Sequence, residues 1–119
     1  LVSIIYYLLS NLMVKHFYSF IVEMDSLFLE IDSLSISTSE KAHLKSLAES
    51  HIHHSILDSI MSELSVDDKR LFLSHLNTKN HEKIWNFLYA RIADVEEKIK
   101  EAAHKIKKEL HKDIREVNN

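Results

Sequence analysis

The sequence contains no glycine, no proline and no cysteine in its 119 residues. Average usage would place about 14 glycines and prolines in a chain of this length. Tight β-hairpins need glycine or asparagine at positive φ, so a fold rich in β-sheet is disfavoured. Helices joined by short polar loops need neither residue, because asparagine can take the left-handed position at a helix end. The absence of cysteine excludes disulfides, thiolate catalysis and cysteine-based zinc sites, and is compatible with a reducing cytoplasm, where we expect the protein.

Charge is also scarce at the start of the chain. Residues 1–22 carry only Lys15 out of 15 basic and 18 acidic side chains. This segment has the length of a membrane helix, although Asn11, Lys15 and His16 dilute its apolar character. Three interpretations of this segment stay open: an extension that is not part of the native chain, a membrane-associated helix, and a helix of the core. In the first interpretation, the native chain would start at Met13 or Met24. The sequence therefore predicts an apolar extension over residues 1–23 and a single helical domain over residues 24–119, with a membrane location as the alternative.

Helical periodicity and capping residues divide the remaining sequence into elements. Residues 24–34 form a short amphipathic stretch, and Ser37 with Glu40 reads as a capping box that opens a helix to about Ser62. Ser65 with Asp68 and then Asn80 predict the starts of the next two helices.

The last helix is the clearest element of the sequence. Asp94 with Glu97 predicts a start near Val95, and the alternative is one continuous helix from His81. Its narrow apolar seam contains Ile99, Ala103, Ile106, Leu110, Ile114 and Val117. The predicted fold is all-α, a small irregular bundle of about four to five helices with a long amphipathic C-terminal helix.

The order of these features resembles a family of small, uncharacterised, all-helical bacterial domains of unknown function. The resemblance covers about residues 24–114 and depends on a capped long helix, a short helix, an aromatic helix and a Lys/Glu-rich terminal helix. The sequences that carry it are Leu64-Ser65-Val66-Asp67-Asp68, the connection 79–83, and Ile84-Trp85-Asn86-Phe87-Leu88. The resemblance implies no activity, cofactor or catalytic residue.

Two histidine patterns are candidates for metal chemistry. Paired Glu-x-x-His motifs, Glu40–His43 and Glu101–His104, occur in di-iron helical bundles, where all ligands face inward. Glu101 and His104 lie roughly 140–200° from the Ile99 seam, and Glu40 has a capping role, so both pairs are interpreted as surface residues. His51, His53 and His54 do not complete a zinc coordination sphere. The chain also lacks the glycine-rich turns of oxyanion holes and phosphate loops. The sequence predicts no enzyme, no cofactor and no metal site.

Apolar residues of the last two helices are the candidates for partner binding. Ile84, Trp85 and Leu88 share a face that we expect to enter the core, whereas Phe87 and Tyr89 lie off it. The predicted partner surface comprises Phe87, Tyr89, Ile99, Ile106 and Leu110.

The predicted function is a protein-interaction or assembly module. Its partner would be an unknown protein or a second copy bound through the C-terminal helix, and no small-molecule substrate is predicted. One alternative is membrane association, through residues 1–22 alone. A second is weak nucleic-acid binding through the lysine-rich C-terminal helix, which the net charge of −3 does not favour.

Overall fold

The computed structural model describes residues 16–118, and within this range it contains helices and no strand. The predicted all-α class is therefore confirmed for the described part of the chain. The helices are α2 (Asp25–Asp32), α3 (Thr38–Met61), α4 (Val66–Thr78), α5 (His81–Arg91) and α6 (Val95–Asn118).

Side-chain caps fix three of the helix starts, as the sequence predicts. The Ser37 hydroxyl accepts the Glu40 N–H at 3.1 Å, and the Ser37 N–H donates to the Glu40 carboxylate at 3.4 Å, which completes a capping box. Ser65 accepts the Asp68 N–H at 3.2 Å, and Asn80 accepts the Lys83 N–H at 3.1 Å. Each cap satisfies an amide that has no partner inside its helix.

The chain breaks between α5 and α6, so the alternative of one continuous helix is wrong. Ile92 is extended, with φ −124° and ψ 118°, and Asp94 has a left-handed φ of 54°. An ordinary N-cap is extended, so Asp94 begins α6 differently from the predicted cap. Lys79, at the end of α4, is also left-handed, with a φ of 57°. Asparagine occupies neither position.

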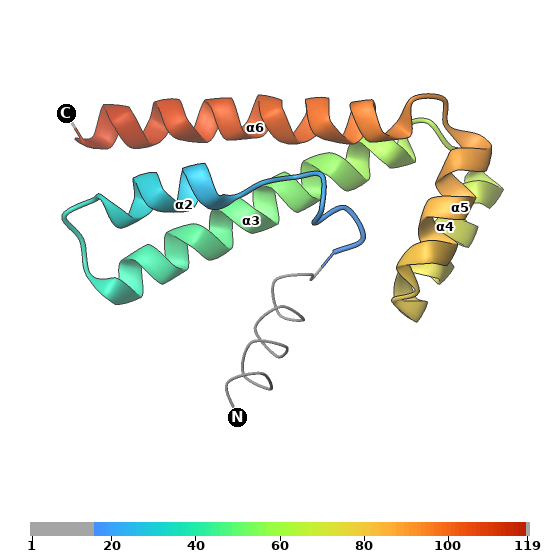
Figure 1. Ribbon diagram of the computed structural model, residues 1–119, viewed down its shortest axis with the longest axis horizontal. Helices are drawn as coiled ribbons and strands as arrows, with labels where there is room; N and C mark the ends of the chain where they lie inside the picture. The colour runs from blue at the N-terminus through green and yellow to red at the C-terminus, as the bar shows by residue number, and fades with distance from the viewer. Residues whose placement is uncertain (1–15, 119) are drawn as a thin grey trace.

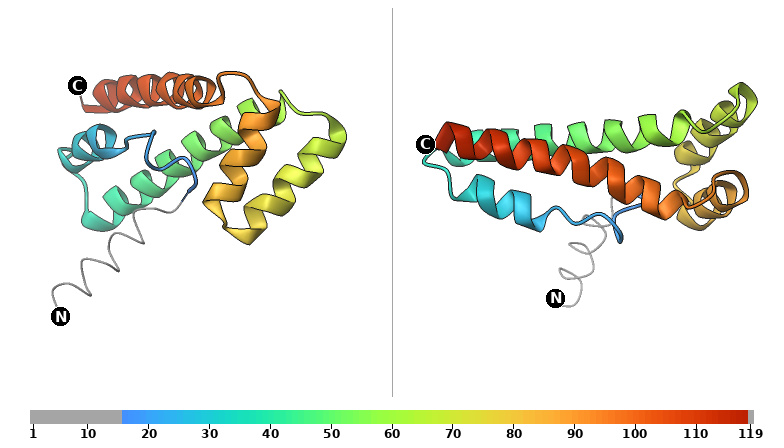
Figure 2. Two further views of the ribbon diagram at one scale, coloured as in Figure 1. Left: turned by 45° about the vertical axis from the view of Figure 1, so that its right-hand side comes forward. Right: turned by 90° about the horizontal axis from the view of Figure 1, so that it is seen from above.

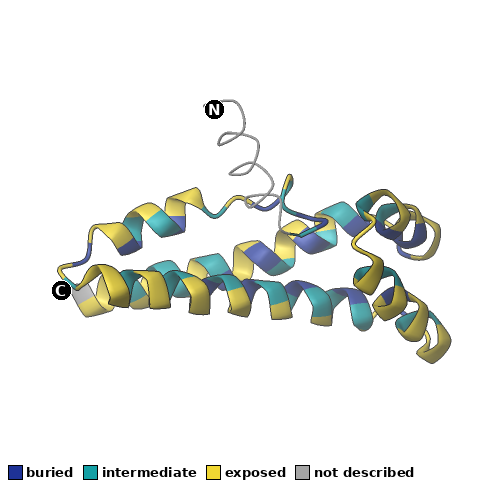
Figure 3. Ribbon diagram, turned by 90° about the horizontal axis from the view of Figure 1, so that it is seen from below, coloured by how far each residue is buried: buried dark blue, intermediate teal, exposed yellow. Residues whose placement is uncertain are grey.

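Helices α2, α3 and α6 pack side by side as a three-helix bundle (Figure 1). The fully buried residues Ile52 and Ile56 of α3 and Ile99 of α6 lie in its centre, together with the small residues Ala48 and Ala103. Figure 3 shows this burial along the inner faces of α3 and α6. Burial of isoleucine side chains along these stripes is the main stabilising contribution.

Helices α4 and α5 form a hairpin at one end of the bundle, and they run across the direction of α6 (Figures 1 and 2). Phe72 stacks on Phe87 with ring centroids 6.4 Å apart. The Arg91 guanidinium lies 4.0 Å from the Phe87 ring centroid, and its Nε lies 3.2 Å from the Asp68 carboxylate. These contacts hold the two helices together.

Residues 16–24 form an irregular segment before α2, here called the N-terminal strap. Phe17, Tyr18 and Val22 are buried in the core. The Phe17 ring meets Phe72 and Trp85 edge to face, at centroid distances of 6.2 and 5.4 Å. The Trp85 indole Nε1–H donates to the Phe17 carbonyl at 2.9 Å. The described part of the predicted extension therefore contributes to the domain core.

The predicted membrane anchor falls mostly on residues 1–15, which lie outside the described residues. Among residues 16–118, no helix combines the length and the apolar character that crossing a membrane requires.

Candidate functional site

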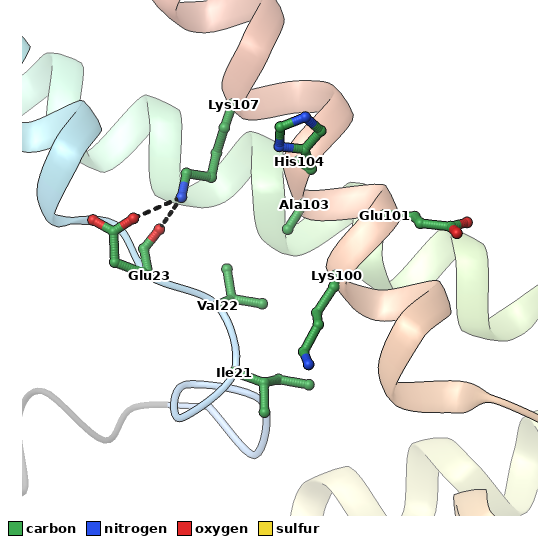
Figure 4. A pocket seen from close by; sticks show the side chains of 8 residues that line it. All are labelled: Ile21, Val22, Glu23, Lys100, Glu101, Ala103, His104 and Lys107. Carbon is green, nitrogen blue, oxygen red and sulfur yellow. Dashed lines mark hydrogen bonds and ion pairs between the residues drawn. The ribbon is translucent and has the colours of Figure 1, made fainter.

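A pocket of about 390 Å³ lies between the strap and α6, here called the strap pocket (Figure 4). The residues of α6 that line the pocket share one helix face, because residues three, four or seven positions apart lie on the same side of a helix. From the strap, the irregular backbone brings three consecutive residues against that face. The lining consists of Ile21, Val22, Glu23, Lys100, Glu101, Ala103, His104 and Lys107.

The floor of the strap pocket is apolar. Val22 is 8% exposed and Ala103 is 3% exposed, and both belong to the hydrophobic core. Ile21 is half-buried and packs against the same core.

One ion pair closes the end of the strap pocket next to α2. The Lys107 ammonium lies 3.0 Å from the Glu23 carboxylate and also donates to the Glu23 carbonyl. The Ser26 N–H donates to the same carboxylate at 2.5 Å. The Ser26 N–H and the Lys107 ammonium hold the pKa of Glu23 below its usual value, so this carboxylate is charged and already neutralised.

The other charged residues of the strap pocket lie on its rim. Lys100 extends towards Ile21, and Glu101 projects away from the strap (Figure 4). The Lys100 ammonium lies 3.5 Å from the Glu97 carboxylate, and both side chains are largely exposed. His104 is exposed above Ala103, as the sequence predicts for the Glu101–His104 pair.

A polar cluster ties the strap to α3. The Tyr18 hydroxyl forms a hydrogen bond with Nδ1 of His53, and the His16 ring stacks on His53 at 4.2 Å between centroids. His16 Nε2 lies 3.6 Å from the Glu49 carboxylate. Burial, reinforced by the negative charge of Glu49, raises the pKa of Tyr18, so its phenol is neutral at all ordinary pH values.

This cluster accounts for one of the three neighbouring histidines that were considered as metal ligands, His51, His53 and His54. Within residues 16–118, no group of histidine and carboxylate side chains has the arrangement of a metal site. His51 and His54 are exposed, whereas His53 joins Tyr18 and His16. The sequence gives no signal for this pairing, because 35 positions separate Tyr18 from His53.

The predicted partner surface is not one continuous surface. Phe87, Ile99 and Ile106 are buried, with 6%, 0% and 9% of their surfaces exposed, and Leu110 packs against the same core. Only Tyr89 is well exposed, stacked on Trp85 at 5.5 Å and donating to Glu96 at 2.5 Å. Within the described residues, α2 and α3 cover the α6 seam.

A second hollow, of about 540 Å³, lies where the connection between α2 and α3 meets the last turn of α6. Its lining includes Leu34, Ile36, Leu44 and Val117, together with His43 and Glu40. Both Glu40 and His43 are exposed, as the sequence predicts. This hollow brings no cluster of basic or acidic side chains together.

Comparisons with protein-family models, with curated proteins and with solved structures find no match to this chain. These comparisons therefore assign the chain to no family.

Proposed function

We propose that the protein is a helical protein-interaction module that contacts its partner through the outer surface of α4. One observation carries the proposal. Helix α4 buries a single side chain, Phe72, and exposes three large apolar ones: Val66, Leu71 and Leu73 are 64%, 46% and 48% exposed. A surface helix ordinarily turns its apolar residues towards the core and its polar residues outwards.

The positions of these residues define the contact face. Val66 and Leu73 are seven residues apart and therefore share one side of the helix, with Arg70 between them. Leu71 lies on the opposite flank of Phe72, about 200° around the helix from Leu73. Val66 and Leu73 therefore form an exposed apolar strip beside an arginine, a residue type that is enriched in protein interfaces, where lysine is depleted.

The surface of α6 is less suited than that of α4 to bind a second copy or nucleic acid. The α6 seam is occupied within the chain, so a dimer through that seam would have no apolar stripe to pair. Helix α6 carries seven basic side chains against six acidic ones. Several of the basic groups are paired, for example Lys98 with Glu63 at 3.4 Å. This balance favours a protein partner over nucleic acid, whose binding depends on a concentrated positive field. The proposal includes a cytoplasmic location and assigns no catalytic activity.

The proposal is tested by site-specific photocrosslinking in extracts of cells that naturally contain the protein. A photoreactive phenylalanine replaces Leu73, and the matched control carries it at Lys108, an exposed position of α6. We expect a covalent protein adduct from position 73 and none from position 108. An adduct of twice the chain mass identifies a second copy as the partner, and another mass identifies a different protein. No adduct at position 73, or equal adducts at both positions, contradicts the proposal.

The nucleic-acid alternative has its own test. We expect the native chain to give no mobility shift with duplex DNA at low salt. A salt-sensitive shift that the triple variant Lys105/Lys107/Lys108→Glu abolishes would establish this alternative instead.

A further inference from the structure

We propose that the strap pocket binds a short aliphatic carboxylate, with the carboxylate at Lys100 and the alkyl chain over Val22 and Ala103. This site is separate from the α4 contact face, and its occupant is a small molecule. The proposal depends on the shape, the floor and the charges of the pocket.

The shape and the floor define an apolar tail. A volume of about 390 Å³ lies at the lower end of the range for small-molecule pockets, so the ligand is small. Val22 and Ala103 form a floor without polar side-chain atoms, and Ile21 forms the wall on the strap side. Contact with this floor removes alkyl surface from water and favours a chain of several methylene groups.

The charges define the head group. Lys107 is neutralised by Glu23 at 3.0 Å and holds the closed end of the pocket. Lys100 extends towards the strap (Figure 4), and its ammonium lies 3.5 Å from the carboxylate of Glu97, whose side chain is 68% exposed. Exposed ion pairs of this kind contribute little, so an incoming carboxylate competes with Glu97 for the ammonium. The exposed His104 adds a second donor on the same rim.

The same arrangement disfavours other ligands of equal size. An alkyl ammonium would place its charge beside the Lys100 ammonium. Of the two acids that line the pocket, Glu23 is already paired with Lys107 and Ser26, and Glu101 projects away from the strap (Figure 4). A neutral alcohol would use the floor but would leave the lysine without an anionic partner. The pocket is therefore selective for a carboxylate that carries an apolar chain.

The test follows the amide resonances of Val22, Glu23, Ala103 and His104 in the ¹⁵N-labelled full chain during titration with sodium hexanoate. We expect saturable shifts at these amides, with an affinity for hexanoate higher than for butyrate by up to about fourfold per methylene. Hexanol, hexylammonium and acetate should bind much more weakly at constant ionic strength. Absent shifts, or equal shifts with hexanol and hexanoate, would overturn the proposal.

Three variants locate the carboxylate. Lys100→Gln should weaken hexanoate binding by about three- to tenfold, and Glu97→Gln should strengthen it by about twofold, because it removes the competing anion. Lys112→Gln is the matched control, since this α6 lysine is 77% exposed and pairs with Glu116 outside the pocket. All three substitutions replace largely exposed side chains, and a circular dichroism melt verifies that each variant folds. Equal weakening by Lys100→Gln and Lys112→Gln would show general charge attraction and would refute the site. The α4 crosslink is measured on different residues, so either proposal can fail alone.

Discussion

Replacing Phe17 with alanine tests whether the strap is part of the folded domain. Phe17 is 4% exposed and contacts the rings of Tyr18, Phe72 and Trp85. Removal of a fully buried phenylalanine ring typically costs about 3–5 kcal/mol. The strap is irregular and lies outside the helices, so it can detach locally, and the loss cannot exceed its free energy of docking. We therefore expect Phe17→Ala to lower the free energy of unfolding by about 2–4 kcal/mol.

Phe20 provides a matched control within the same turn. It is 82% exposed, so Phe20→Ala removes the same atoms from the chain with little loss of packing. We expect a change of less than about 0.5 kcal/mol for this variant. For a chain of 119 residues, each kcal/mol corresponds to roughly 4 °C in the melting temperature. The two variants should therefore differ clearly in a thermal melt.

Urea unfolding of both variants should be followed by far-ultraviolet circular dichroism and by tryptophan fluorescence. Trp85 is the only tryptophan, and its indole donates to the Phe17 carbonyl, so its emission reports on strap docking. Local detachment in Phe17→Ala would shift the emission in native buffer while the helical signal persists. If Phe17→Ala matches Phe20→Ala by both probes, the assignment of the strap to the core is wrong.

Three further predictions concern single interactions. Because folding raises the pKa of Tyr18, the contribution of its neutral phenol to stability should be complete below pH 10.0, its ordinary pKa, and should decline as the pH rises further. Above pH 10.0, the urea midpoint of Tyr18→Phe should therefore fall less steeply with pH than that of the unsubstituted chain. Because folding lowers the pKa of Glu23, the contribution of its carboxylate to stability should be complete above pH 4.5, its ordinary pKa, and should be lost as the pH falls below that value. Acid unfolding curves of Glu23→Gln should lack this loss of stability. Ser37→Ala should cost about 1 kcal/mol in chemical denaturation by removing the α3 cap, whereas Ser39→Ala, at an exposed position in the first turn, should be nearly neutral.

The helices could be predicted from the sequence because their signals are local. Ser37 with Glu40, and Ser65 with Asp68, are three positions apart, so each cap is decided by neighbouring residues. The face of α5 that enters the core was harder to predict from the sequence. The periodicity places Phe87 off the core face, but Phe87 is buried against Phe72; Trp85 is only partly buried, and its indole donates to the Phe17 carbonyl. Such contacts join distant segments, and helical periodicity carries no information about them.

The strap pocket could not be predicted for the same reason. Its two walls, residues 21–23 and 100–107, are far apart in the sequence, and each has an unremarkable pattern by itself. From the sequence alone, Lys100 and His104 belong to the solvated side of an amphipathic helix. Lys100 and His104 become pocket-lining residues because the strap places an apolar wall opposite side chains that would otherwise face only water.

Val22 connects the strap's docking to the proposed ligand site, because this side chain belongs both to the core and to the pocket floor. A ligand bound there contacts α6 in any case but contacts the strap only when the strap is docked, so binding and docking must stabilise each other. A ligand at 100 times its dissociation constant should stabilise the docked state by about 2.7 kcal/mol. Conversely, Phe17→Ala should lower the apparent affinity for hexanoate in proportion to the fraction of molecules whose strap remains docked, although Phe17 does not line the pocket. Unchanged hexanoate affinity in a variant whose Trp85 emission reports an undocked strap would separate the two events and would place the ligand elsewhere.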